Sequence, residues 1–210
     1  MSKTYANLNR ALVKAGLPTK AMQRVKGFNL ELECPIDILV NAGVNAAPFA
    51  DVLLEFAKKL TIPNEIDMVV RCMTQPKGFH QAVPWLFSLF KGYPRNGLTE
   101  SHLWTVGSAI YTIDAKDSYS KVISICRAKK YGGGRQLLMG TLSRAKTNET
   151  YNVLLKCLDD PSIRAHAIEA LGRFGRTDAI HILERLAVRK GLFEFKAKET
   201  AMRRLRHKLS

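Results

Sequence analysis

The sequence predicts an all-α protein built from successive helix pairs, and three observations carry that prediction. From about residue 64 onward, segments of about 12 to 16 residues with helical character follow one another, each ending at turn residues. In the clearest segments the apolar residues recur every three or four positions, which is the period of one helix face. Similar helices also return at spacings close to 30 residues, for example Asp117 and Asp178 at twice that spacing, as in stacked two-helix repeats.

The first 62 residues are less regular. Apolar and polar residues alternate from Phe28 to Cys34, which favours extended backbone. The elements expected here are a basic helix over 4–15, irregular or partly extended chain over 27–46, and a helix over 47–60. This region 1–62 is either a cap on the repeats or a partner-binding arm.

The remainder, 63–210, is expected to form one continuous repeat domain without strands. Within 162–174 the apolar residues fall at i, i+4, i+7, i+8 and i+11, on one helix face. Ser162 is placed to cap the start of that helix, and Gly175 follows where helices commonly end. The helices expected are 64–75, 77–93, 99–113, 117–130, 135–144, 148–158, 162–174, 178–189 and 194–209.

The stretch 158–187, LDDPSIRAHAIEALGRFGRTDAIHILERLA, is the most specific part of the chain. Its turn acids Asp159 and Asp160, the following Arg164, and the small residue Gly172 inside the next helix resemble HEAT repeats, particularly the short HEAT-like form also found in phycobiliprotein lyases. The resemblance implies a HEAT-like α-solenoid of about four antiparallel helix pairs, without implying lyase activity. Gly172 would let neighbouring helices approach closely, and Arg164 is placed to hydrogen-bond the turn acids.

The formal charge of +15 is concentrated at the two ends of the chain. Residues 1–30 carry six basic side chains and no acid, and residues 185–210 carry nine basic against two acidic ones, whereas the middle adds only +2. This concentration of positive charge favours an anionic partner, either nucleic acid or an acidic protein surface. The alternative is a solvated capping helix that keeps the end of the repeats soluble. A pI near 9.9 favours the first interpretation.

Two groups of cations are therefore candidate anion-binding residues. In the last expected helix, Phe195, Lys198, Met202, Leu205 and Leu209 mark the packing stripe, and cations cover the rest of its circumference. A second group surrounds the glycine-rich turn 131–135, where backbone N–H groups could meet a phosphate at the start of a helix. The candidates are Arg185, Arg189, Lys190, Lys196, Arg203, Arg204, Arg206 and Lys208, with Lys129, Lys130 and Arg135 around the turn.

The only tryptophans, Trp85 and Trp104, are candidates for an aromatic groove that stacks on bases, although aromatic residues among helices usually pack in the core. Helical repeats, size and basic charge are similar to the HEAT-like alkylpurine DNA glycosylases, which place an Asp four positions after a groove Trp. Here Ser108 occupies that position, so such activity would need another carboxylate near Trp104, for instance Glu100 or Asp114.

Other classes of function find no support in the sequence. Four dispersed cysteines without a CxxC pair exclude a disulfide framework and disfavour a zinc site, and no cofactor or metal motif is present. The polar start and the lack of a long apolar run predict a cytoplasmic protein without a membrane span. We therefore expect a non-enzymatic scaffold that engages an anionic partner through a concave face and basic termini, with a glycosylase-like enzyme and a protein–protein adaptor as alternatives.

Overall fold

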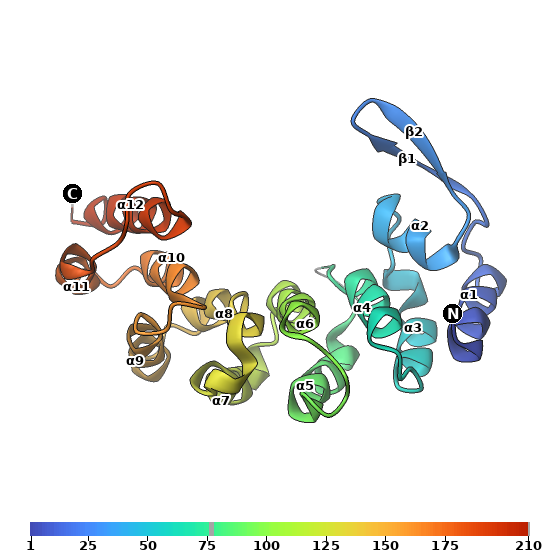
Figure 1. Cartoon of the computed structure of the whole chain (residues 1–210), viewed down its shortest axis with the longest axis horizontal. Coiled ribbons are helices and arrows are strands. Elements are labelled where there is room, and N and C mark those ends of the chain that lie inside the picture. Colours follow the sequence, from blue (N-terminus) through green and yellow to red (C-terminus); the bar gives the residue numbers. More distant parts are fainter. Residues whose placement is uncertain (76–77, 210) are drawn as a thin grey trace. The chain divides into compact units, whose positions relative to one another are not determined.

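The computed structural model describes residues 1–75 and 78–209 and shows a mostly helical protein in which helices adjacent in sequence pack together (Figure 1). The chain divides into two compact units, Met1–Ile113 and Asp114–Ser210. The boundary expected near residue 62 falls inside the first unit.

Several helices of unit 1 begin at a proline or at a side-chain cap. Ser2 caps the first helix by accepting a hydrogen bond from the Tyr5 N–H, and Pro35, Pro63 and Pro84 lie in the first turns of later helices, where a missing N–H costs nothing. The helices are α1 (Lys3–Lys14), α2 (Pro35–Asn41), α3 (Ala50–Ala57), α4 (Pro63–Cys72), α5 (Val83–Gly92) and α6 (Glu100–Ile113), with short 3-10 turns η1 (Ala47–Phe49) and η2 (His80–Ala82).

Packing in unit 1 follows chain order. Helix α1 contacts α2 and α3, α4 contacts α2, α3 and α6, and α5 contacts α6. The helix expected over 77–93 begins later, at Val83, after η2; its expected start, Lys77, lies outside the described residues. The expectation of non-helical chain over 27–46 was wrong for α2, which Pro35 starts and whose Ile36, Ile38 and Leu39 are buried.

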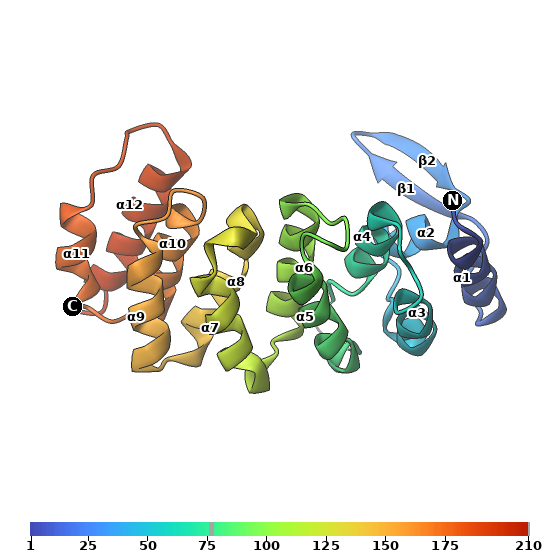
Figure 2. The same ribbon diagram turned by 60° about the horizontal axis from the view of Figure 1, so that its bottom comes forward.

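A β-hairpin extends beyond the helices of unit 1 (Figures 1 and 2). Strands β1 (Ala21–Val25) and β2 (Phe28–Leu32) pair antiparallel, with Val25 opposite Phe28. Lys26 and Gly27 have φ of 48° and 90°, and two consecutive positive φ angles define the turn that best matches strand twist. The extended backbone expected from Phe28 is therefore confirmed for β2, whereas β1 was not expected.

Unit 2 contains α7 (Tyr119–Arg127), α8 (Leu138–Ala145), α9 (Asn148–Cys157), α10 (Arg164–Phe174), α11 (Ala179–Arg185) and α12 (Phe193–Arg206), with 3-10 turns η3 (Lys116–Ser118) and η4 (Lys129–Arg135). Helix α10 is central, since it packs against α8, α9 and α12 (Figure 1). Helix α7 contacts α8 and α9, and α11 contacts α12.

The close approach expected at Gly172 is confirmed. A Cβ on this residue would lie 2.7 Å from the Cα of Ala201, in the backbone of α12. Gly175 also ends α10 as expected, in the left-handed conformation with φ of 81°. The helices α10 and α12 therefore pack backbone to backbone at this point, which only a residue without a side chain allows.

Two expectations for the turn before α10 were wrong. Ile163, not Ser162, occupies the cap position of α10, because the Ser162 hydroxyl instead donates to Asp160 at 2.7 Å. The side chain of Arg164 does not bind the carboxylates of the turn acids. Its Nε donates to the Leu158 carbonyl at 2.7 Å and its Nη1 lies 3.7 Å from a carboxylate oxygen of Glu194 on α12.

Candidate anion-binding surface

Helix α12 buries one narrow face, because small and apolar residues recur there at helical spacing. Ala197, Ala201, Met202 and Leu205 are buried. The packing stripe expected from the sequence was correct for Met202 and Leu205 but wrong for Leu209, which is 67% exposed. Since the buried face is narrow, most of the circumference of α12 is left to charged side chains.

Lys198 interrupts the expected stripe for a structural reason. Its Nζ donates to the carbonyls of Glu184 at 3.1 Å and Leu186 at 2.8 Å. These carbonyls lie at the end of α11, where helices leave acceptors without intrahelical partners. Helix α11 ends at Arg185 rather than at Arg189 as expected, and Lys198 holds that end against α12.

Six exposed cations surround this end of unit 2 without a partner. They make no ion pair or side-chain hydrogen bond to any other residue in the described part of the chain. Lys196 and Arg203, seven positions apart, share the side of α12 that faces away from its buried residues. We call these six residues the cationic cluster: Arg185, Arg189, Lys190, Lys196, Arg203 and Arg204.

The other two C-terminal candidates, Arg206 and Lys208, are not counted in the cationic cluster. Arg206 donates to a carboxylate oxygen of Glu184 at 3.0 Å. The Lys208 ammonium lies against Gly175 at the end of α10, and its charge, after burial, contributes to lowering the pKa of Lys146. The cationic cluster therefore leaves out Arg206, which is paired, and Lys208, which is exposed but lies against the end of α10.

A groove lies beside the cationic cluster, between the end of α11 and α12. Its volume is about 770 Å³, which is within the range of small-molecule and cofactor sites. The chain that follows α11 contributes Leu186 and Val188 to its lining, and α12 contributes Phe195, Met202 and Arg203. No pattern in the sequence predicted this groove, which we call the α11–α12 groove.

The cations of the glycine-rich turn differ in their exposure to solvent. Lys129 and Lys130 are exposed, with the Lys130 ammonium 4.9 Å from the centre of the Tyr131 ring. Arg135 is only 2% exposed, so the expectation that it meets a phosphate was wrong. Gly132, with φ of 46°, adopts a backbone conformation suited to glycine, which accounts for one glycine of the turn without a ligand.

The guanidinium of Arg135 is fully engaged inside unit 2. Its Nε donates to the Gly132 carbonyl at 2.9 Å and its Nη1 to the Cys126 carbonyl at 3.1 Å. Its Nη2 donates to a carboxylate oxygen of Asp160 at 2.6 Å and to the Ser162 hydroxyl at 3.1 Å. Burial acts to raise the pKa of Asp160, but the hydrogen bonds from Ser162 and Arg135 outweigh it and lower that pKa. Arg135 therefore makes the contact that the sequence analysis assigned to Arg164.

The two tryptophans lie in unit 1. Trp85 on α5 is half-buried and Trp104 on α6 is 43% exposed. Of the acids considered beside Trp104, Glu100 begins α6, and Asp114 lies in unit 2, where it pairs with Arg144 at 3.3 Å and Lys116 at 3.8 Å. Asp114 is thereby committed to stabilising the start of unit 2.

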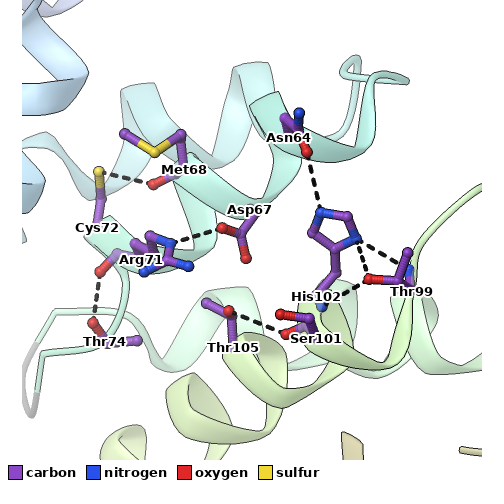
Figure 3. Close-up of polar contacts among 10 residues, drawn as sticks. All are labelled: Asn64, Asp67, Met68, Arg71, Cys72, Thr74, Thr99, Ser101, His102 and Thr105. Atoms are coloured by element: carbon purple, nitrogen blue, oxygen red, sulfur yellow. Dashed lines mark hydrogen bonds and ion pairs between the residues drawn. The ribbon is translucent and has the colours of Figure 1, made fainter.

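A polar cluster that the sequence analysis missed joins α4 to α6 (Figure 3). The Nε of Arg71 donates to Asp67 at 2.7 Å, while the other carboxylate oxygen of Asp67 is buried without a partner in the described residues. The His102 ring lies between Asn64 on α4, at 3.2 Å, and the N–H of Thr99, at 3.0 Å. The contact between Asn64 and His102 holds the start of α6 against α4 and gives His102 a structural role.

The described residues contain no group of three side chains suited to bind a metal ion. All four cysteines are free thiols, and burial raises the pKa of Cys157 to about 11 and that of Cys72 to about 12. Across 1–75 and 78–209 there is also no helix with the length and apolar character needed to cross a membrane.

Comparison with known proteins gives no further guide to function. No family model, no curated protein and no solved structure matches this chain.

Proposed function

We propose that this protein is a HEAT-like binding scaffold that holds the phosphate backbone of a nucleic acid on the cationic cluster of unit 2. The repeat resemblance of residues 158–187 and the packing of consecutive helices support the scaffold. The observation that carries the proposed ligand is the cationic cluster itself, six exposed side chains within residues 185–204 that have no acidic partner in the described chain.

Long cationic side chains that fan over a helix surface suit a phosphate backbone, because each neutralised phosphate releases condensed counterions. The opposite end of the sequence strengthens this choice of partner. Residues 1–30 add six cations without any acid, and a strongly basic chain is the electrostatic signature of nucleic-acid binding. An acidic protein surface is the competing partner, and the experiment below separates the two.

The test measures fluorescence anisotropy of labelled DNA and RNA oligomers at two salt concentrations about fourfold apart. Salt-sensitive binding is expected. The variant Lys196→Gln/Arg203→Gln/Arg204→Gln removes three charges and is expected to weaken duplex binding and to reduce the slope of log K against log salt by up to about 3. Arg206 is left intact because its ion pair with Glu184 also holds α12 to α11.

A matched control removes the same number of charges elsewhere. Lys58, Arg95 and Lys156 are exposed, and no interaction of their side chains is present in the described structure. Their triple replacement by Gln should leave the slope almost unchanged. Equal effects of the two triple variants would show that only net charge matters, and binding of a polyglutamate peptide without binding of either oligomer would assign the cluster to an acidic protein.

The hairpin of unit 1 favours a second candidate function, that of a protein–protein adaptor. Val25, Phe28 and Leu30 share one face of the hairpin and are 41%, 78% and 53% exposed. Clustered exposed apolar side chains are typical of protein contact sites. Under this function, Phe28→Ser/Leu30→Ser should abolish binding of a protein partner in a titration while oligomer binding is retained.

A further inference from the structure

The α11–α12 groove differs in chemistry from the cationic cluster beside it. Its exposed surface is mainly apolar, and Leu186, Val188, Phe195 and Met202 are among the residues that line its volume of about 770 Å³. An apolar wall offers nothing to a phosphate, which requires hydrogen-bond donors or positive charge. It suits a flat, poorly hydrated ring that can lie against an aromatic side chain.

Among the described residues that line the groove, positive charge without a partner is present at only one side chain. Lys198 is occupied by the two carbonyls at the end of α11, and Arg206 is occupied by Glu184. Arg203 lines the groove, is exposed and has no partner among the described residues. A ligand in the groove therefore meets an apolar surface that continues directly into a free guanidinium of the cationic cluster.

We propose that the α11–α12 groove takes an unstacked base of a single-stranded nucleic acid, with an adjoining phosphate on Arg203. This inference rests on the proposed function, since the cationic cluster holds the backbone that carries the base. A cationic track combined with an aromatic platform is how proteins bind single strands without reading their sequence. A duplex keeps its bases paired and stacked, so only single strands use the groove.

Glu199 provides a sharp test because it works against the proposed ligand. It lines the groove four positions before Arg203, and no partner for its carboxylate is present in the described structure. Its charge repels a phosphate bound at Arg203. Glu199→Gln is therefore expected to tighten single-strand binding several-fold, a gain that a purely structural role of this residue would not produce.

The main experiment compares a labelled thymidine oligomer with an abasic oligomer of the same length and number of phosphates. Both are titrated with the full chain by anisotropy. The two ligands share their charge and differ only in their bases, and stacking of one base contributes between about 5-fold and about 150-fold in affinity. The abasic oligomer is expected to bind more weakly by a factor in that range.

Variants at Phe195 connect the difference to the groove. Phe195→Ala should remove most of the preference for the thymidine oligomer without changing the affinity for the abasic oligomer or for duplex DNA. Phe195→Leu keeps the side chain apolar and of similar size, so a folded protein that has lost the preference would assign the effect to the aromatic ring. Circular dichroism of both variants checks the fold.

Each other result overturns the inference in a recognisable way. Equal affinity for the thymidine and abasic oligomers would show that no base binds in the groove, and phosphate binding by the cationic cluster would still stand. If neither oligomer binds at low salt, both the groove inference and the proposed function fail. A loss of affinity for both oligomers in Phe195→Ala would show that the ring acts through the fold, and Phe195-dependent binding of polyglutamate alone would assign the groove to an acidic peptide.

Discussion

Replacement of Arg135 by Met is expected to destabilise unit 2 strongly, although a basic side chain beside a glycine-rich turn would ordinarily be removed at little cost. The methionine fills much of the same volume and removes every donor of the guanidinium. Asp160 then loses its ionic partner, and the carbonyls of Cys126 and Gly132 lose the hydrogen bonds that Arg135 donates.

The magnitude follows from these contacts. Removing one member of a buried ion pair costs about 3–5 kcal/mol, and each buried acceptor left unsatisfied costs about 1–3 kcal/mol. Asp160 keeps its hydrogen bonds to Ser162, and its side chain is 16% exposed, which offsets part of this cost. We therefore expect a loss of about 3–5 kcal/mol in the free energy of unfolding.

Urea unfolding followed by far-ultraviolet circular dichroism measures this loss. For a unit of this size, with a urea dependence of about 1–3 kcal/mol per M, the midpoint should fall by at least about 1 M. Lys129→Met is the matched control, because it removes one positive charge from the same turn at an exposed position. Since Trp85 and Trp104 both lie in unit 1, tryptophan emission reports the first unit while circular dichroism reports both.

A midpoint for Arg135→Met within about 0.3 M of the wild type, and equal to that of Lys129→Met, would refute the reasoning. Arg135 would then be a surface cation, and the phosphate-binding turn expected from the sequence would be restored. The double variant Arg135→Met/Asp160→Asn adds a second check. If the two side chains pair as described, their effects are not additive, and the double variant is more stable than the sum of the single variants predicts.

Three further outcomes are expected. Gly172→Ala should lower the free energy of unfolding by about 1–2 kcal/mol in urea titrations, because overlap with the Ala201 backbone outweighs the gain in helix propensity, whereas Gly92→Ala, which meets only a side-chain amide, should cost less. Burial acts to raise the pKa of Asp160, but hydrogen bonds outweigh it and hold that pKa below the unfolded value near 3.9. The contribution of ionised Asp160 to the stability of the fold is therefore complete above that pH and is lost as the pH falls through the folded-state pKa. In Asp160→Asn, the free energy of unfolding should depend less on pH below about pH 5. In native protein at pH 8, a thiol reagent should modify Cys34 first, because the other three cysteines are buried, and Cys34→Ser should remove that fast phase.

Local patterns were sufficient to predict helices because the apolar residues of a buried helix face recur visibly within about a dozen residues. The period in 162–174 and the glycine after it correctly predicted α10 and its end. The hairpin illustrates the reverse case. Strand β1 was not expected because its apolar residues do not alternate. It faces mostly solvent, so no buried face imposes a period of two on it. The turn at Lys26–Gly27, a residue followed by glycine between two extended runs, was the available signal.

The exchange of roles between Arg164 and Arg135 shows where sequence reasoning fails in this fold. Both arginines lie near turns, and Arg164 is only four positions from Asp160 in sequence. The turn geometry nevertheless directs Arg164 to a carbonyl, while the carboxylate of Asp160 receives an arginine 25 positions earlier in the chain. Sequence proximity predicts local hydrogen bonds well only when the backbone conformation between the two residues is already known.

One part of the candidate site, its positive charge, could be predicted from the sequence, and the other part, the groove, could not. The excess of positive charge is a property of composition, so residues 185–208 could be predicted to attract anions without knowledge of the fold. The α11–α12 groove depends on the early end of α11 at Arg185 and on the hydrogen bonds by which Lys198 holds that end to α12. In the sequence, Lys198 reads as an interruption of an apolar stripe. In the structure it holds the end of α11 against α12, next to the groove and the cationic cluster. Because an apolar groove lies beside the cations, we expect single strands, and not only phosphates in general, to bind here.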